Sequence, residues 1–278
     1  MSRILSYLRG RTVLALAAVL FVALAAGSDR AFAQDSVRAA PRANAGARLP
    51  FGPGEVLEYR VHVSIAGEVG AGVMSVEGPE REGGTILWIL RSEIEAGRGP
   101  VRAKDQTRSW FDPARGAITR FEKIERHPLS RSEERVQIDA ALGTFTDAGN
   151  APARLGSAEP LDELSFLYFL RTLPLDREGV LVLRRHFDPA RNPTIVRILG
   201  EETLTLPSGI FRTRVVEMEV RDKKRFRGSG TIRVNIDLGA CRVPVQIESR
   251  MPLLGTTTLV LSGWMHPPRY PFAFWCDG

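Results

Sequence analysis

Hydrophobic and polar residues alternate along most of this chain, which predicts a protein built mainly from β-strands. Between Glu55 and Ile65 every second residue is apolar, and the intervening positions carry residues such as Glu58, Arg60 and His62. Successive side chains of a strand point to opposite faces, so this period of two indicates a strand with one buried face. Similar patterns predict strands over residues 69–77, 85–95, 104–111, 117–126, 132–138, 142–146, 180–187, 194–206, 210–221, 231–238, 243–250 and 256–262. Short strands at this regular spacing are typical of an antiparallel barrel or sandwich.

One stretch has helical rather than strand character. Residues 160–174 (PLDELSFLYFLRTLP) begin and end with proline, which interrupts a helix, and apolar side chains occupy most sides of the helical wheel. Asp162 is the predicted N-cap, and Glu163 suits the positive end of the helix dipole. At about ten to twelve residues the helix is too short to span a bilayer, so we expect it to be buried. Glycines in the strand at 69–77 indicate a tightly curved sheet. Together, the strands and the helix predict an all-β, mainly antiparallel protein, in which a curved, half-open, barrel-like sheet surrounds one buried helix.

The N-terminus has the three parts of a secretory signal peptide. Arg3, Arg9 and Arg11 precede an apolar run over residues 12–26, and residues 31–33 (AFA) supply a cleavage site. We therefore predict cleavage after Ala33 and a periplasmic or secreted protein with no transmembrane segment after cleavage. The alternative is an uncleaved signal anchor.

The sequence predicts one domain behind this signal peptide. Residues 34–50 contain little to bury and are expected to be a disordered linker, residues 51–265 form the β domain, and residues 266–278 form an aromatic tail. The two cysteines, Cys241 and Cys276, both follow the signal peptide. A lone pair of cysteines in an oxidising compartment is more often bonded than free, so we predict a disulfide between them.

Charge and motifs exclude several function classes. The signal peptide carries four Arg and one Asp, so its removal lowers the formal net charge from +6 to +3, which is too small to indicate nucleic-acid binding. The four histidines lie far apart, and there is no nucleophile elbow, phosphate-binding loop or dinucleotide fingerprint. We predict no catalytic residue, metal site or cofactor. Stretches such as residues 119–126 (TRFEKIER) also offer too little apolar surface for an outer-membrane barrel.

Two polar features remain as candidate sites. Tyr168 and Arg171 interrupt the apolar helix and are the candidate ligand-binding residues, presented into a cavity between helix and sheet. In the alternative interpretation they are structural, with Arg171 at the negative end of the helix and the Tyr168 hydroxyl hydrogen-bonded in the core. The second feature is the basic run over residues 221–227 (RDKKRFR), which is either a solvated loop or a patch for anionic lipid headgroups or acidic glycan.

Four ordered motifs resemble those of the DUF3108 family of exported bacterial proteins. They are residues 51–59 (FGPGEVLEY), 162–171 (DELSFLYFLR), 206–211 (LPSGIF) and 242–248 (RVPVQIE), within a similarity that runs from about residue 50 to residue 263. One departure is residues 236–241 (IDLGAC), where the family pattern has an acidic turn before the arginine. The resemblance implies a periplasmic protein with a curved, antiparallel, barrel-like fold, and it implies no established activity.

These observations favour a non-enzymatic binding or accessory protein of envelope biogenesis. Such a module would hold an apolar or amphiphilic ligand in its barrel-like cavity, because barrel mouths commonly hold ligands. One alternative is a hydrolase that acts on glycan or peptidoglycan through two carboxylates. Another is a structural scaffold of an envelope complex. The expected partner is accordingly a lipid or glycan ligand or an envelope protein, and not nucleic acid.

Overall fold

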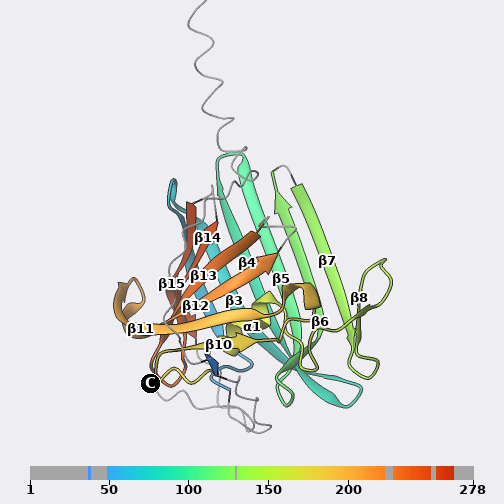
Figure 1. The fold of residues 1–278 in the computed structure, drawn as a ribbon. Helices are drawn as coiled ribbons and strands as arrows, with labels where there is room; N and C mark the ends of the chain where they lie inside the picture. Colours follow the sequence, from blue (N-terminus) through green and yellow to red (C-terminus); the bar gives the residue numbers. More distant parts are fainter. Residues whose placement is uncertain (1–36, 39–48, 129, 223–227, 252–254, 266–278) are drawn as a thin grey trace, which may run out of the picture.

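The protein folds into a single curved sheet that bends around one short helix (Figure 1). A computed structural model describes residues 37–38, 49–128, 130–222, 228–251 and 255–265. Each strand predicted from the alternation of apolar residues has a counterpart in the structure, which adds two short strands that were not predicted, β1 and β9. The strands are β1 (Val37–Arg38), β2 (Val56–Val63), β3 (Gly67–Glu82), β4 (Thr85–Arg98), β5 (Val101–Asp112), β6 (Ala117–His127), β7 (Ser130–Asp139), β8 (Thr144–Asp147), β9 (Ala153–Arg154), β10 (Gly179–Leu183), β11 (Thr194–Leu206), β12 (Gly209–Asp222), β13 (Gly228–Asp237), β14 (Pro244–Met251) and β15 (Gly255–Met265).

The strands follow one another around the sheet in the order β1-β10-β11-β12-β13-β14-β15-β2-β3-β4-β5-β6-β7-β8-β9. All neighbours are antiparallel except β1 and β10, and the described strands do not close into a barrel. We call one end of the sheet the rim, where strands β2, β4, β6, β12 and β14 end. The opposite end, which we call the base, holds the helix. The predicted mainly antiparallel, half-open, barrel-like sheet is therefore confirmed.

The helix α1 (Glu163–Leu170) lies against the concave side of the sheet at the base (Figure 1). Its N-cap is Asp162, as predicted: the carboxylate accepts hydrogen bonds from the backbone N–H groups of Leu164 and Ser165. The Ser165 hydroxyl accepts in return from the backbone N–H of Asp162, which completes a capping box. Six of the eight helical residues are buried, and all of these except Ser165 belong to one hydrophobic core with residues from strands on both sides of the helix.

Glycine in β3 permits the curvature that the sequence indicated. A side chain at Gly70 would place its Cβ 1.9 Å from the carbonyl oxygen of Glu95, so only glycine lets β3 and β4 lie this close. A register shift in the β2–β3 pairing falls at the same place, between Val61 and His62. A bulge of this kind bends a strand and increases its local twist.

The structure differs from the sequence-based expectation at three places. β10 ends at Leu183 rather than at Phe187, because the backbone beyond it pairs with Leu161 instead of β11: the Arg185 carbonyl accepts from the Leu161 N–H, and the Phe187 N–H donates to the Leu161 carbonyl. Within the expected linker, β1 pairs with β10 and Pro50 is buried. β13 begins at Gly228, which pairs with Asp222, rather than at residue 231.

Candidate functional site

Arg171, the C-cap residue of α1, forms a buried ion pair with Glu55 at the start of β2. The guanidinium donates from both terminal nitrogens to the two carboxylate oxygens at 2.7 Å each, and the side chains are 1% and 2% exposed. Nη2 also donates to the carbonyl oxygens of Pro50 (2.6 Å) and Cys241 (2.8 Å). Burial alone would lower the pKa of Arg171, but the adjacent Glu55 carboxylate raises it above its usual value. Arg171 therefore joins the helix to two separate segments at the base, residues 50–55 and the segment that contains Cys241.

Two tyrosines lie beside this ion pair, and we call Glu55, Tyr59, Tyr168 and Arg171 the basal cluster. The Tyr59 hydroxyl donates a hydrogen bond of 2.8 Å to the carbonyl oxygen of Pro244, whereas the Tyr168 hydroxyl has no hydrogen-bond partner among the described residues. Burial raises the pKa of both tyrosines, so both stay neutral. The Phe51 ring packs against Tyr168, with 4.8 Å between ring centroids.

A second group of polar residues lies on the concave face between the core and the rim. Strand register aligns the inward side chains in rows across the sheet, and each row changes from apolar to polar along it. One row runs through Tyr59, Gly72, Ile94, Asp105, Glu125 and Ser132. The next row towards the base runs through Leu57, Met74, Ser92, Thr107, Lys123 and Glu134. In these two rows the charged side chains thus lie on β5–β7, whereas β2–β4 contribute only uncharged residues.

The charged side chains of this inner wall are paired with one another. Nε2 of His127 lies 2.8 Å from a carboxylate oxygen of Asp105, and Nζ of Lys123 lies 3.1 Å from Glu125, which also accepts from the Ser132 hydroxyl at 3.0 Å. The hydrogen bond to Asp105 raises the pKa of His127. Lys123 and Glu125 are only 15% and 19% exposed. The concave side thus carries partly shielded, paired charges towards the rim.

The wall that faces them across the sheet is apolar. Three of its inward residues towards the rim pack against the core as partly buried apolar side chains, namely Val220, Ile232 and Leu259, and the hydroxyl residues Ser249 and Thr257 lie in the row of Ile232. The concave side therefore combines an apolar wall with a charged one above the buried helix.

Comparison with known proteins assigns the chain to a family. The model of the family described as "Protein of unknown function (DUF3108)" matches residues 58–262. The chain belongs to the DUF3108 family. A search of curated proteins finds no match to this DUF3108 sequence.

Three solved structures resemble the DUF3108 fold at low sequence identity. The barrel-like DUF1849 protein from Brucella abortus has a TM-score of 0.49 and 12% identity, covering 77% of this chain and 98% of its own. A candidate lipoprotein from Parabacteroides distasonis has a TM-score of 0.29 and 10% identity, covering 78% and 99%. A candidate exported protein with a YmcC-like fold from Bacteroides fragilis has a TM-score of 0.28 and 11% identity, covering 78% and 98%. At these TM-scores no property of the three proteins is carried over to this chain.

Three of the four motifs by which the sequence resembles DUF3108 meet at the basal cluster. Glu55 and Tyr59 come from the first motif, and Tyr168 and Arg171 come from the helix motif. Arg242, from the last motif, donates to the carbonyl oxygens of Arg171 (3.1 Å) and Leu173. Arg171 lies 116 positions from Glu55 and 71 positions from Arg242, so residues far apart in the sequence fasten the helix to the sheet.

The candidate ligand-binding residues Tyr168 and Arg171 both lie in this basal cluster and are fully buried. Arg171 occupies the position that the structural interpretation assigns to it, at the C-terminal end of the helix, and contact with a ligand stays a prediction. The sequence did not identify Glu55 as its partner. It also did not identify Asp105, Lys123, Glu125 and His127 as neighbours, because only the strand register brings them together.

Three further expectations concern residues that the structure describes in part or not at all. Cys241 is buried in the core, but Cys276 lies outside the described residues, so the disulfide stays a prediction. The signal peptide over residues 1–33 and most of the basic run over 221–227 also lie outside them. Within the described part of the chain, no three metal-ligating side chains gather to hold a metal ion, and no helix has the length and apolar character needed to cross a membrane.

Proposed function

We propose that this DUF3108 protein is an exported binding module that holds an amphiphilic molecule against the concave face of its sheet. The observation that supports this proposal is the division of the concave face into an apolar and a charged wall. An amphiphile fits both walls at once: its chain packs on Ile232 and Leu259, and its headgroup exchanges hydrogen bonds with residues such as Lys123, Glu125 and His127. Each methylene group removed from water contributes about 0.8 kcal/mol, so the chain supplies affinity and the polar wall supplies orientation.

The pairing of the inner charges favours binding over hydrolysis. Asp105 and Glu125 lie opposite each other on β5 and β6, as two catalytic carboxylates would. Each of them already contacts a basic side chain, His127 or Lys123. A glycoside hydrolase needs both carboxyl groups free to act on the scissile bond, one as acid and the other as base or nucleophile, whereas each of these two is already engaged by a basic neighbour.

The proposal is tested by extracting bound molecules from protein purified from the periplasmic fraction. Mass spectrometry of the extract should show a molecule with a long apolar chain and a polar headgroup, in an amount comparable to that of the protein. The variant Ile232→Asn should retain much less of it, because the substitution places an amide on the apolar wall.

Glu217→Gln is the matched control, since Glu217 lies on β12 and pairs with Arg233 on the outer face. This variant should retain as much amphiphile as the wild type. An extract without long-chain molecules, or equal retention by Ile232→Asn and the wild type, would contradict the proposed function.

A further inference from the structure

The outer face of the sheet carries a cluster of basic side chains where β5, β6 and β7 reach the rim. Cross-strand pairing places Lys104, Arg126 and Arg131 side by side in one row. Arg102 lies on the same face of β5, two residues closer to the rim than Lys104. Arg102 and Arg126 are exposed, and the Arg131 side chain is 65% exposed. We call these four residues the outer rim patch.

The positive charge of the outer rim patch is only partly balanced. Lys104 forms ion pairs with Glu93 and Glu95, and Arg131 reaches Glu133 at 3.9 Å. Arg126 instead donates to the side-chain oxygen of Gln106, and Arg102 forms no ion pair with the residues that the structure describes.

Basic residues elsewhere on the outer face are matched more closely. Arg197 lies 2.8 Å from Glu219, and Arg233 pairs with both Glu202 and Glu217. The outer rim patch is therefore a local excess of positive charge on a face whose charges otherwise alternate.

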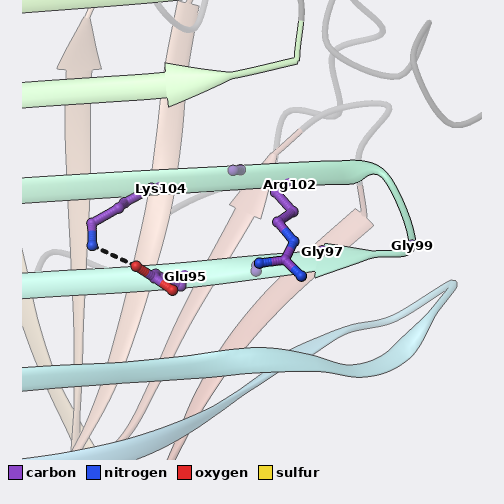
Figure 2. Close-up of a pocket in the computed structure, with 7 residues that line it drawn as sticks. Glu95, Gly97, Gly99, Arg102 and Lys104 are labelled. Atoms are coloured by element: carbon purple, nitrogen blue, oxygen red, sulfur yellow. Dashed lines mark hydrogen bonds and ion pairs between the residues drawn. The ribbon is translucent and has the colours of Figure 1, made fainter.

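A shallow pocket of about 310 Å³ lies within this patch, on the β4–β5 hairpin (Figure 2). Its polar lining comes from Glu95, Arg102 and Lys104, and Gly97 and Gly99 expose their backbone beside them. A Cβ at Gly97 would come within 2.3 Å of the carbonyl oxygen of Val101, so only glycine lets β4 and β5 lie this close at the hairpin. The side chain of Arg102, which is exposed, extends across Gly97 and lines the pocket beside the ion pair of Lys104 and Glu95 (Figure 2).

We propose that the outer rim patch docks the protein onto the anionic headgroups of a phospholipid bilayer. Arginine and lysine near an anionic membrane each strengthen binding about fivefold, so a row of cations across three adjacent strands suits an extended anionic surface. Neighbouring strands lie about 4.8 Å apart, so the row can contact several headgroups at once. Docking through the rim also brings the bilayer next to the concave face. This surface is separate from the inner wall, and the proposal does not depend on the function proposed above.

The test is flotation of the protein, purified from the periplasmic fraction, with lipid vesicles. Vesicles that contain phosphatidylglycerol should bind it, vesicles of phosphatidylcholine alone should bind it much less, and binding should weaken between low salt and about 0.15 M salt as the charges are screened. The double variant R126E/R131E should reduce binding to phosphatidylglycerol vesicles by at least about 25-fold, from two lost cations at about fivefold each.

The matched control is R177E/R212E, which reverses two arginines that are 61% and 72% exposed and lie away from the rim. It changes the net charge equally and should bind nearly as tightly as the wild type. Both variants should keep the wild-type melting temperature, because all four side chains are on the surface. Equal binding to the two kinds of vesicle, or R126E/R131E binding as tightly as R177E/R212E, would overturn the proposal. The latter result would assign membrane binding to other basic residues.

Discussion

Substituting Glu55 by glutamine tests how much the buried ion pair contributes to the fold. Glutamine keeps the shape of the side chain and one acceptor, but it leaves the Arg171 guanidinium, 1% exposed, without a counter-charge. Removing one partner of a buried pair costs about 3–5 kcal/mol, because the remaining charge stays desolvated. Since a domain is stabilised by roughly 5–15 kcal/mol, the variant should lose a large part of its free energy of unfolding.

Urea unfolding at neutral pH, followed by circular dichroism, measures this loss. The double variant Glu55→Gln/Arg171→Met should recover stability relative to Glu55→Gln, since no unpaired charge remains. It should stay about 2 kcal/mol below the wild type, because the carbonyls of Pro50 and Cys241 lose their donor.

Glu219→Gln is the control, because Glu219 makes a 2.8 Å pair with Arg197 on the outer face, where both side chains are about 30% exposed. Its cost should be at most about 1 kcal/mol. If Glu55→Gln costs no more than Glu219→Gln, the basal ion pair does not hold the helix to the sheet and the reasoning fails.

Three further predictions concern the core. Tyr168→Phe should leave the free energy of unfolding unchanged or slightly higher, whereas Tyr59→Phe should lower it by about 1 kcal/mol, because only Tyr59 donates a hydrogen bond, to Pro244; equal effects in urea unfolding would contradict this. Leu170→Ala should cost about 2–5 kcal/mol, since Leu170 is fully buried in the core, and a wild-type melting temperature would show that the helix is peripheral. Burial lowers the pKa of His186 in the folded protein to about 4. Between pH 6.5 and pH 4 the imidazole therefore binds a proton in the unfolded chain but not in the folded one, which lowers the free energy of unfolding by on the order of 3 kcal/mol. Unfolding curves of His186→Asn over this pH range should lack that component, and a pH dependence identical to that of the wild type would refute the assignment.

The strands and the helix could be predicted because their signals are local. Period-two alternation marks β2 and β13 without knowledge of their neighbours, and Asp162 signals the start of the helix within one turn. The glycine-rich sequence of residues 69–77 also indicated a close backbone contact, and the structure shows it at Gly70, where β3 and β4 leave no room for a side chain.

The candidate site could not be predicted because its signals are non-local. Glu55 and Arg171 are 116 positions apart, and neither position shows which opposite charge it will meet. Asp105, Glu125 and Ser132 look like ordinary solvated residues of three strands. They become one row only in the observed register, and a shift of one residue would turn them to the opposite face.

The open sheet has a consequence for the range of molecules that the concave side can accommodate. At the base an isolated bridge between Leu161 and His186 joins the segments that follow β9 and β10. Towards the rim, β7 pairs with β8 only from Val136 onward, so residues 130–134 have no strand neighbour on that side among the described residues. In a closed barrel the number and stagger of the strands determine the diameter. The described strands leave the sheet open here, so strand pairing does not fix the distance between the walls at the rim to one width of occupant.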